Sequence, residues 1–174
     1  MDLADTTAIQ QLVVILESMK IIGIDPGTAI TGFGVIEIKQ GNPSMLDAGV
    51  VRTPANTPIT ERLEEIYDGI KELCELHQPD EASVEKLFFA QNVTTAISVS
   101  HARGVVLLAL AQANVKIYEY TPLQIKQAIT GYGRADKNQI QEMVKLQLKL
   151  KQIPKPDDAA DALAAALTHA QTTH

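Results

Sequence analysis

The chain has 174 residues, 45% of them hydrophobic, and this length and composition fit one globular domain rather than two. A single cysteine, Cys74, excludes an internal disulfide and a cysteine-based zinc site, which favours a reducing compartment. The formal net charge of −6 at pH 7 argues against a broadly basic surface, so any contact with an acidic polymer must use locally clustered bases.

Residues 1–18 differ in composition from the rest of the chain. They hold Asp2, Asp5 and Glu17 but no Lys or Arg, so 18 acidic residues remain against 15 basic ones once they are set aside. They lack the basic stretch of a signal peptide, and their apolar run is too short to span a bilayer. We expect residues 1–18 to be a disordered or peripheral extension, residues 19–174 to form the domain, and the protein to have no membrane association.

Three short strands and a helix are predicted next. Apolar and β-branched runs cover residues 20–25, 32–38 and 46–52, and Gly, Asn and Pro separate them, which is typical of an antiparallel meander. From about residue 57 onward the apolar positions recur at helical spacing, and Cys74 falls on this apolar stripe. We therefore expect Cys74 to be a small core residue.

Helices and strands alternate in the second half. A fourth strand is predicted to end near Glu85 and a fifth to cover residues 115–120, with a long apolar helix at about 92–113 between them. This order predicts an α/β fold with a mixed five-stranded sheet and helices on both faces. Further helix starts are indicated by capping residues or Pro, at Thr121, Asp136 and Asp157.

Four acidic residues fall where strands end or a helix begins. Asp25 follows the first strand and precedes a Pro-Gly-Thr turn, and Glu85 ends the fourth strand. Asp158 and Asp161 are three residues apart, so both lie on one face of the last helix, which is otherwise rich in Ala and Leu. Each acid could instead serve locally, as an Asx-turn residue, a helix-dipole partner or half of an ion pair.

Taken together, the four acids predict an all-oxygen site for hard divalent ions. Mg²⁺ prefers carboxylate and water ligands. Two such ions about 3.5–4 Å apart stabilise both the attacking and the leaving oxygen when a phosphodiester is displaced in line. Metal ions would also offset the acidity of the chain, so its net charge does not exclude nuclease chemistry.

Five motifs occur in an order and spacing that resemble one family. They are IIGIDPGTAITGFGVI, SVEKLFFAQN, ARGVVLLA, YTPLQIKQAITGYGRADKNQIQEMV and DDAADALAAALTHA. Over essentially residues 19–170, the chain is similar to the RuvC family of Holliday-junction resolvases. The resemblance implies a ribonuclease-H-like fold and a crossover junction endodeoxyribonuclease. Such an enzyme uses Mg²⁺ or Mn²⁺, two ions per subunit, to nick two symmetric strands of a four-way DNA junction in recombination and repair.

The resemblance also implies partners and catalytic residues. The family works as a homodimer in the bacterial cytoplasm, alongside the RuvA–RuvB branch-migration complex. The D-A-A-D spacing matches Asp158 rather than Asp157. The catalytic, metal-binding carboxylates are therefore expected at Asp25, Glu85, Asp158 and Asp161.

Three further residues match positions that contact DNA in the family. Phe88 matches an aromatic that stacks on an unpaired base near the junction centre, the alternative being a core residue. Lys126 and Lys137 match lysines that contact phosphate, although each could be a solvated lysine on a helix face. Arg103 lies in the long apolar helix that the family uses for dimer contact, where a structural role is as plausible.

Other functions compete with this one. The actin and sugar-kinase group opens with a similar GIDxGT turn, but it needs a second half for which this chain is too short. A nuclease of the same ribonuclease-H-like fold that acts on RNA or on other substrates is a second alternative. A DNA-binding module without catalysis is a third.

Overall fold

A computed structural model describes residues 18–87 and 93–173, with residues 93–95 described by their backbone alone. The chain forms one five-stranded sheet in the order β3-β2-β1-β4-β5. Its strands are β1 (Ser18–Asp25), β2 (Ile30–Lys39), β3 (Asn42–Arg52), β4 (Glu81–Glu85) and β5 (Lys116–Tyr120). β1, β2 and β3 are antiparallel neighbours, whereas β4 is parallel to β1 and β5 is parallel to β4. The mixed sheet expected from the sequence is therefore confirmed.

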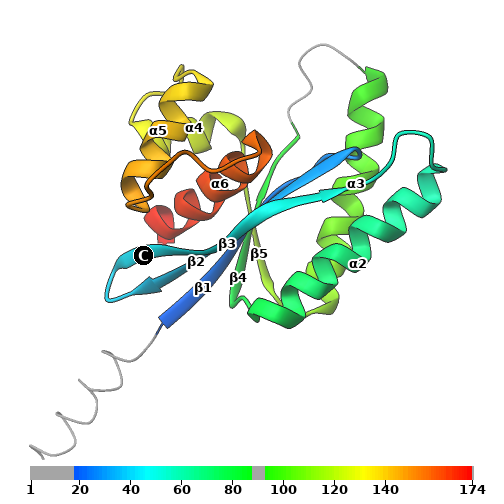
Figure 1. The fold of residues 1–174 in the computed structure, drawn as a ribbon, viewed down its shortest axis with the longest axis horizontal. Coiled ribbons are helices and arrows are strands. Elements are labelled where there is room, and N and C mark those ends of the chain that lie inside the picture. The colour runs from blue at the N-terminus through cyan, green and yellow to red at the C-terminus, as the bar shows by residue number, and fades with distance from the viewer. Residues whose placement is uncertain (1–17, 88–92, 174) are drawn as a thin grey trace, which may run out of the picture.

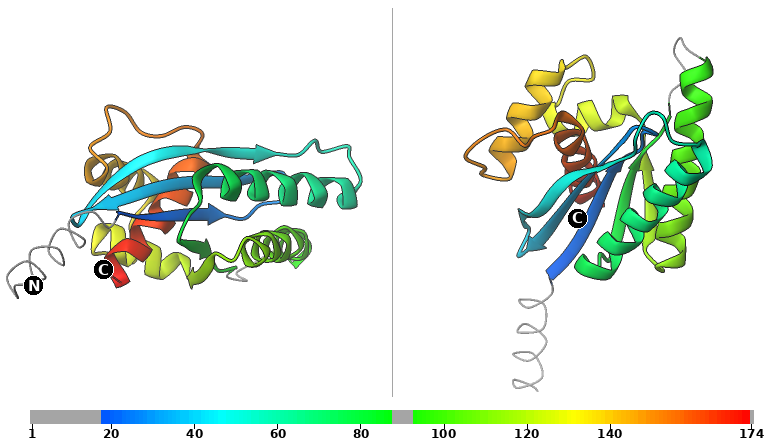
Figure 2. Two further views of the ribbon diagram at one scale, coloured as in Figure 1. Left: turned by 90° about the horizontal axis from the view of Figure 1, so that it is seen from below. Right: turned by 45° about the vertical axis from the view of Figure 1, so that its right-hand side comes forward.

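Helices cover both faces of the sheet, as expected (Figures 1 and 2). One layer consists of α2 (Ile59–His77) and α3 (Val93–Gln112). The other consists of α4 (Pro122–Thr130), α5 (Lys137–Gln147) and α6 (Asp157–Thr173). The predicted extension at residues 1–18 lies outside the described residues except for Ser18, with which β1 begins.

The β2–β3 hairpin is longer than the sequence pattern predicted. Lys39 pairs with Asn42, so only Gln40 and Gly41 form the turn. Both have positive φ angles, 53° and 75°, which suits the tight hairpin turns whose twist matches that of the strands. β3 consequently begins before Pro43, which an edge strand tolerates because no further strand needs its missing N–H group.

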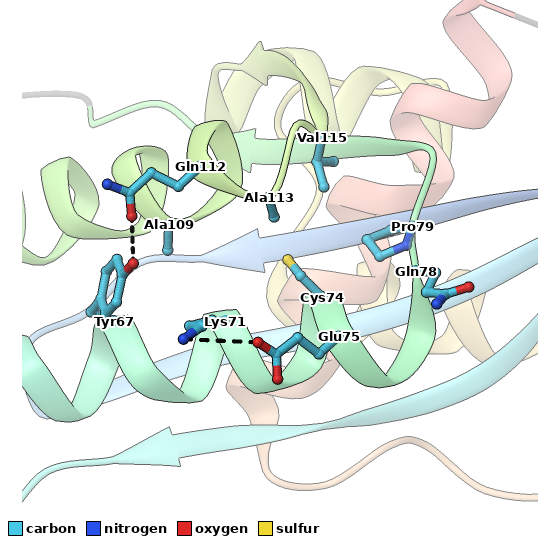
Figure 3. Close-up of a pocket in the computed structure, with 10 residues that line it drawn as sticks. All are labelled: Tyr67, Lys71, Cys74, Glu75, Gln78, Pro79, Ala109, Gln112, Ala113 and Val115. Atoms are coloured by element: carbon cyan, nitrogen blue, oxygen red, sulfur yellow. Dashed lines mark hydrogen bonds and ion pairs between the residues drawn. The ribbon is translucent and has the colours of Figure 1, made fainter.

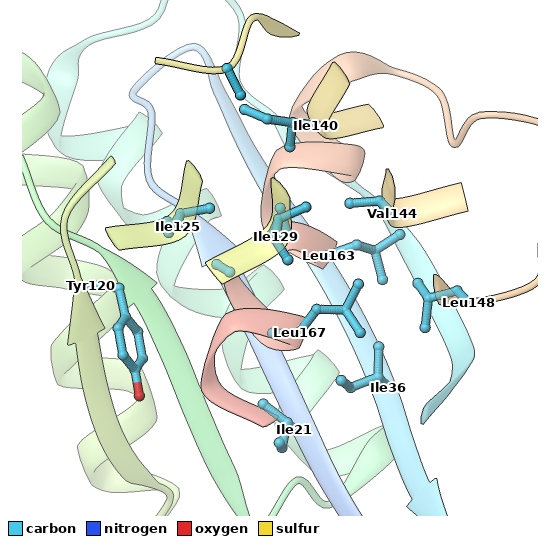
Figure 4. Packing of buried hydrophobic residues seen from close by; sticks show 14 residues of the cluster. Ile21, Ile36, Tyr120, Ile125, Ile129, Ile140, Val144, Leu148, Leu163 and Leu167 are labelled. Carbon is cyan, nitrogen blue, oxygen red and sulfur yellow. The ribbon is translucent and has the colours of Figure 1, made fainter. Parts of the chain in front are cut away.

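The sheet separates two apolar clusters. Along β1, Ile22 and Ile24 face α2 and α3, whereas Ile21 faces the layer of α4, α5 and α6 (Figure 4). This alternation follows from the two-residue period of a strand. It places Gly23 and Asp25 on the same face as Ile21, under α6.

Close contact between α6 and the sheet depends on glycine. A β-carbon on Gly23 would collide with the backbone oxygen of Ala162, and one on Gly32 with the backbone oxygen of Asp158. A β-carbon on Gly34 would lie 2.6 Å from Leu163 Cγ. The sheet face under α6 thus lacks side chains where the helix comes nearest, and the helix backbone packs directly on β1 and β2.

Substitution of Gly23 by Ala is expected to destabilise the fold by about 1–3 kcal/mol, because the helix must move away from the sheet to admit a methyl group. The shift in the urea unfolding midpoint measures this. Gly104→Ala is the matched control, since a β-carbon at Gly104 would meet nothing within 4 Å and α3 should gain helix propensity. Equal midpoints for the wild type and Gly23→Ala would contradict the close packing.

Candidate active site

Asp25 and Glu85 end two neighbouring parallel strands. Ile24 pairs with Val84 in the β1–β4 ladder, so the next residue of each strand is an acid at the same edge of the sheet. Both carboxylates are partly buried. The sequence predicted both strand ends, and the parallel register brings them side by side.

The turn after Asp25 is held by hydrogen bonds of buried threonines. Thr28 Oγ1 lies 2.7 Å from the carbonyl oxygen of Ser98 and donates to it, which ties the turn to α3. Thr31 Oγ1 donates to the carbonyl oxygen of Gly27 at 2.7 Å, and Thr53 Oγ1 donates to that of Thr28 at 2.6 Å. The Pro-Gly-Thr segment therefore has a structural role in fixing where β1 ends.

The remaining two acids reach the site from the first turns of α6. Gly32 pairs with Asp25 across the β1–β2 ladder, and the backbone of Asp158 lies against Gly32. α6 therefore begins directly above the end of β1. Asp161 follows one turn later on the same side of the helix.

Contacts between β4 and α6 follow a regular spacing. Ser83 Oγ donates to the Ala165 carbonyl oxygen at 2.6 Å, and Glu81 Oε2 lies 2.6 Å from His169 Nε2. Two residues of a strand advance about 6.6 Å and four residues of a helix about 6 Å, so alternate β4 residues meet every fourth α6 residue. One further step in this series brings Glu85 to Asp161.

A cavity of about 240 Å³ lies where these elements meet. It contains the side chains of Glu85 and Asp161 together with two lysines, whereas Asp25 and Asp158 lie outside its lining. The lining residues are Glu85, Pro122, Ile125, Lys126, Lys137, Ile140, Asp161 and Ala164.

The acids at this site disfavour each other's charge. Burial, and then the charges of Asp161 and Asp158, raise the pKa of Asp25 to about 7. Burial, and then the charges of Asp25 and Asp161, raise the pKa of Glu85 to about 7. Burial also raises the pKa of Asp161 against the opposing effect of Lys137. These acids are on separate elements but lie within electrostatic reach of one another.

Lys137 pairs with two acids of α6. Its Nζ lies 3.1 Å from Asp161 Oδ2 and 3.5 Å from Asp157 Oδ2. Asp157 also pairs with Lys155 Nζ at 2.7 Å. Asp157 is thus neutralised by two lysines, whereas Asp158 acts on Asp25, and this difference supports the choice of Asp158 as the site residue.

The second predicted lysine, Lys126, lies in the same cavity. Its charge opposes the rise in the pKa of Glu85, and it forms no ion pair with an acid of the described residues. Phe88, the predicted base-stacking residue, lies outside the described residues. Arg103 forms an ion pair with Glu119, which is a structural contact between α3 and β5.

The donor chemistry of the site fits a hard divalent cation, because partly buried carboxylates that repel one another gain most from a cation among them. In the present arrangement, however, no three His, Cys, Asp or Glu side chains of residues 18–87 and 93–173 lie close enough to hold one ion. The backbone positions and the pKa shifts therefore place the acids near one another, as expected, but their side chains do not yet form a set of metal ligands.

Sequence reasoning missed both ion pairs of Lys137, with Asp161 and with Asp157. The sequence indicated Asp157 as a helix start and a neighbour of Asp158, whereas in the structure it pairs with Lys137 and Lys155. The signal was present in the Lys-Pro-Asp-Asp order of residues 155–158. What the sequence does not contain is the approach of α5 to α6, which brings Lys137 to both acids.

A larger cavity of about 390 Å³ lies between α2 and α3, on the other face of the sheet (Figure 3). Tyr67 Oη hydrogen-bonds to Gln112 at its rim. Cys74 is buried there, as predicted, and burial, followed by the charge of Glu75, raises the pKa of its thiol to about 11. The thiol therefore stays protonated near neutral pH and behaves as a small apolar group.

Comparison with known proteins identifies the family. Residues 21–169 match the family model described as "Crossover junction endodeoxyribonuclease RuvC". The chain belongs to the RuvC family. The RuvC protein of Brevibacillus brevis is 56% identical over 153 residues, which cover 88% of this chain and 92% of that protein. The RuvC protein of Desulfitobacterium hafniense is 57% identical over 156 residues, which cover 90% and 94%.

Solved structures agree with the RuvC assignment. T. thermophilus RuvC in complex with Holliday junction substrate superposes with a TM-score of 0.83 at 39% identity, covering 88% of this chain and 93% of that one. The yeast mitochondrial Holliday junction resolvase Ydc2 has a TM-score of 0.63 at 12% identity, a likeness of fold alone. These matches confirm the ribonuclease-H-like fold and set aside the sugar-kinase alternative. Of the helices in the described ranges, none combines the length and apolarity needed to cross a bilayer.

Without metal, the protein is expected to lose stability as the pH rises from about 4 to 7. Asp25 and Glu85 hold protons up to about pH 7 in the folded state, whereas unfolded carboxyl groups lose them near pH 4. The folded state binds more protons in this window, so the free energy of unfolding falls as the pH rises. Asp25→Asn should remove part of this slope and raise the free energy of unfolding at pH 8 by about 1–3 kcal/mol. Urea unfolding in EDTA at pH 5 and pH 8 measures both.

Asp157→Asn is the matched control with the opposite sign. A hydrogen bond from Lys155 lowers the pKa of Asp157, so its charge stabilises the fold above about pH 4. This variant should lose stability at pH 8 and none under acidic conditions. An unchanged pH slope in Asp25→Asn would contradict the burial of that carboxylate among other acids.

Proposed function

We propose that this chain is a Holliday-junction-resolving endonuclease, which nicks two symmetric strands of a four-way DNA junction by metal-dependent hydrolysis during recombination and repair. The observation that carries the proposal is the meeting of Asp25 and Glu85, at adjacent strand ends, with the acids of α6. Membership of the RuvC family supports the same activity. Its substrate would be junction DNA, as in the complex of the T. thermophilus relative.

Four residues would hold the metal ions: Asp25, Glu85, Asp158 and Asp161. We propose Mg²⁺, with Mn²⁺ as a substitute and two ions per subunit, because oxygen donors of this kind suit both ions. When bound, the metal supplies charge stabilisation for the attacking and leaving oxygens of the phosphodiester. The burial of Asp25 and Glu85 raises the benefit of binding a cation there.

Two lysines would bind the DNA backbone at this site. Lys126 lines the cavity that contains Glu85 and Asp161, so its ammonium group can bind the phosphate that enters. Lys137 lines the same cavity from α5, whereas Lys126 lies on α4. Phe88 follows Glu85 by three residues and would stack on an unpaired base, which is worth about 1–3 kcal/mol without sequence preference.

The proposed assembly is a homodimer in the bacterial cytoplasm. Two of the four strands of a four-way junction are equivalent continuous strands, and a two-fold dimer presents two equivalent sites to them. The RuvA–RuvB branch-migration complex would supply the junction to the dimer.

Asp25→Asn is expected to lower the rate of junction nicking by at least about 10²-fold, because several kcal/mol of charge stabilisation depend on bound metal. Binding of the junction should be retained. A synthetic mobile junction with Mg²⁺, compared with linear duplex and RNA–DNA hybrid, tests the activity and its selectivity. Asp68→Asn, on α2 across the sheet, is the control and should cut like the wild type.

Two results would count against the proposal. Normal nicking by Asp25→Asn would show that the site is misplaced. Equal cutting of hybrid and junction would instead favour a nuclease of the same fold with another substrate.

Lys126→Ala is expected to weaken junction binding and to reduce the salt dependence of affinity by about one unit of slope, as for the loss of one phosphate contact. Titrations with labelled junction at several salt concentrations, in Ca²⁺ to prevent cutting, measure the slope. Lys71→Ala on α2, which pairs with Glu75 on the far face, should leave the slope unchanged. If both variants behave alike, Lys126 does not contact the backbone.

A further inference from the structure

The backbone of Lys137 is held in place by the packing and capping of α5. It is the first residue of α5, and the preceding Asp136 caps the helix by accepting from the backbone N–H of Gln139 at 2.9 Å. The buried residues Ile140 and Val144 hold the helix against the core. The ammonium group thus reaches α6 from the first residue of α5, whose backbone is held in place.

This ammonium group already neutralises part of the acidic site. It lies 3.1 Å from Asp161 Oδ2, and its charge lowers the pKa values of both Asp161 and Asp25 against the effects of burial and of the other acids. Asp161 is only 26% exposed, so this pair is partly shielded from water. Lys137 does for Asp161 what a bound cation would do.

The same contact is incompatible with full metal ligation by Asp161. An ammonium group at hydrogen-bonding distance uses a carboxylate oxygen and adds a repelling positive charge beside any incoming ion. No three metal-binding side chains are grouped in the described parts of the chain in this arrangement. Ligation through Oδ2, or through both oxygens of Asp161, therefore requires the ammonium group to leave.

A second partner is in place to receive the displaced lysine. Asp157 Oδ2 is 3.5 Å from Lys137 Nζ, and Asp157 is more exposed than Asp161, at 44%. Lys137 itself is 51% exposed, so its side chain can rotate without breaking core contacts. A short movement toward Asp157 and solvent would free Asp161 without leaving the lysine buried and unpaired.

We infer that Lys137 is an internal counter-cation, which occupies Asp161 in the metal-free protein, is displaced when a divalent ion binds, and then becomes available to a DNA phosphate. This inference rests on the proposed function, because it takes Asp161 as a metal ligand. Metal and DNA would each favour the state in which Lys137 has left Asp161. Binding of one should therefore strengthen binding of the other by the same factor.

The direct test is Mn²⁺ binding without DNA, by isothermal titration calorimetry. Lys137→Met should tighten the apparent Kd about three- to tenfold. In the wild type only the minor fraction of molecules whose lysine has left Asp161 can bind the metal, whereas in the variant Asp161 is always free of it. Lys126→Met removes an equal charge from the same cavity but no ion pair, so it should tighten the Kd by less. Thermal melts confirm that both variants are folded.

A second measurement follows the displacement itself. With ¹³Cε-labelled lysine, the Lys137 signal is identified by its absence from Lys137→Met, and it should shift during Mg²⁺ titration at the same midpoint as metal binding. In Asp161→Asn, the Lys137 signal should start near its shifted position. Junction affinity in Ca²⁺ should also depend less on metal in Lys137→Met than in the wild type.

Three outcomes would overturn the inference. They are an unchanged or weaker Kd in Lys137→Met, an equal tightening in Lys126→Met, and a Lys137 signal that ignores Mg²⁺. Any of these in a wild-type protein that nicks junctions would leave the proposed function intact. A wild type that neither binds metal nor nicks junctions would remove both.

Discussion

The direct contact between α6 and the sheet is the constraint on which the site depends. Three glycines on β1 and β2, Gly23, Gly32 and Gly34, leave the sheet surface bare beneath the helix. α6 itself presents small alanines, and almost all of its residues from Ala159 to His169 are buried. Backbone therefore packs on backbone, and the acids at the start of the helix come within electrostatic reach of those at the strand ends.

This packing holds like charges together against their repulsion. The cost appears in the pKa values of Asp25 and Glu85, both raised to about 7, first by burial and then by the charges of neighbouring acids. Apolar contacts of α6 with both the sheet and α4 and α5 keep the arrangement in place. The stored repulsion favours cations, whether an ammonium group from α5 or a metal ion, and it explains how an acidic chain can be suited to an acidic polymer.

Much of this architecture could be predicted from the sequence because local residue patterns determine it. Strand alternation, the helix caps at Thr121 and Asp136 and the acids at element ends all appeared at or near their predicted positions. The five motifs further identified the family. The assignments of the four acids and of Lys126, Lys137 and Phe88 to functions stay predictions.

The features that sequence reasoning did not supply arise from contacts between distant segments. Nothing local to Gly32 indicates that it faces the backbone of Asp158, and nothing local to Lys137 indicates that its ammonium group sits on Asp161. The two-residue hairpin turn was missed because Gln40 is an unusual residue for a positive φ angle. Local patterns determine the elements, whereas side-chain partners across the site depend on how those elements dock.

The C-terminal end of α6 is also held in place by specific contacts, which involve His169. The ring of His169 is fully buried, with Nδ1 2.8 Å from Tyr120 Oη and Nε2 2.6 Å from Glu81 Oε2. Its centroid lies 4.1 Å from that of the Tyr118 ring. Sliding the helix by one residue would turn every side chain about 100° around its axis, and these directional bonds oppose that rotation. The hydrogen bonds of His169 thus fix the rotation of α6 about its own axis, and with it the direction in which the aspartates at the other end of the helix point.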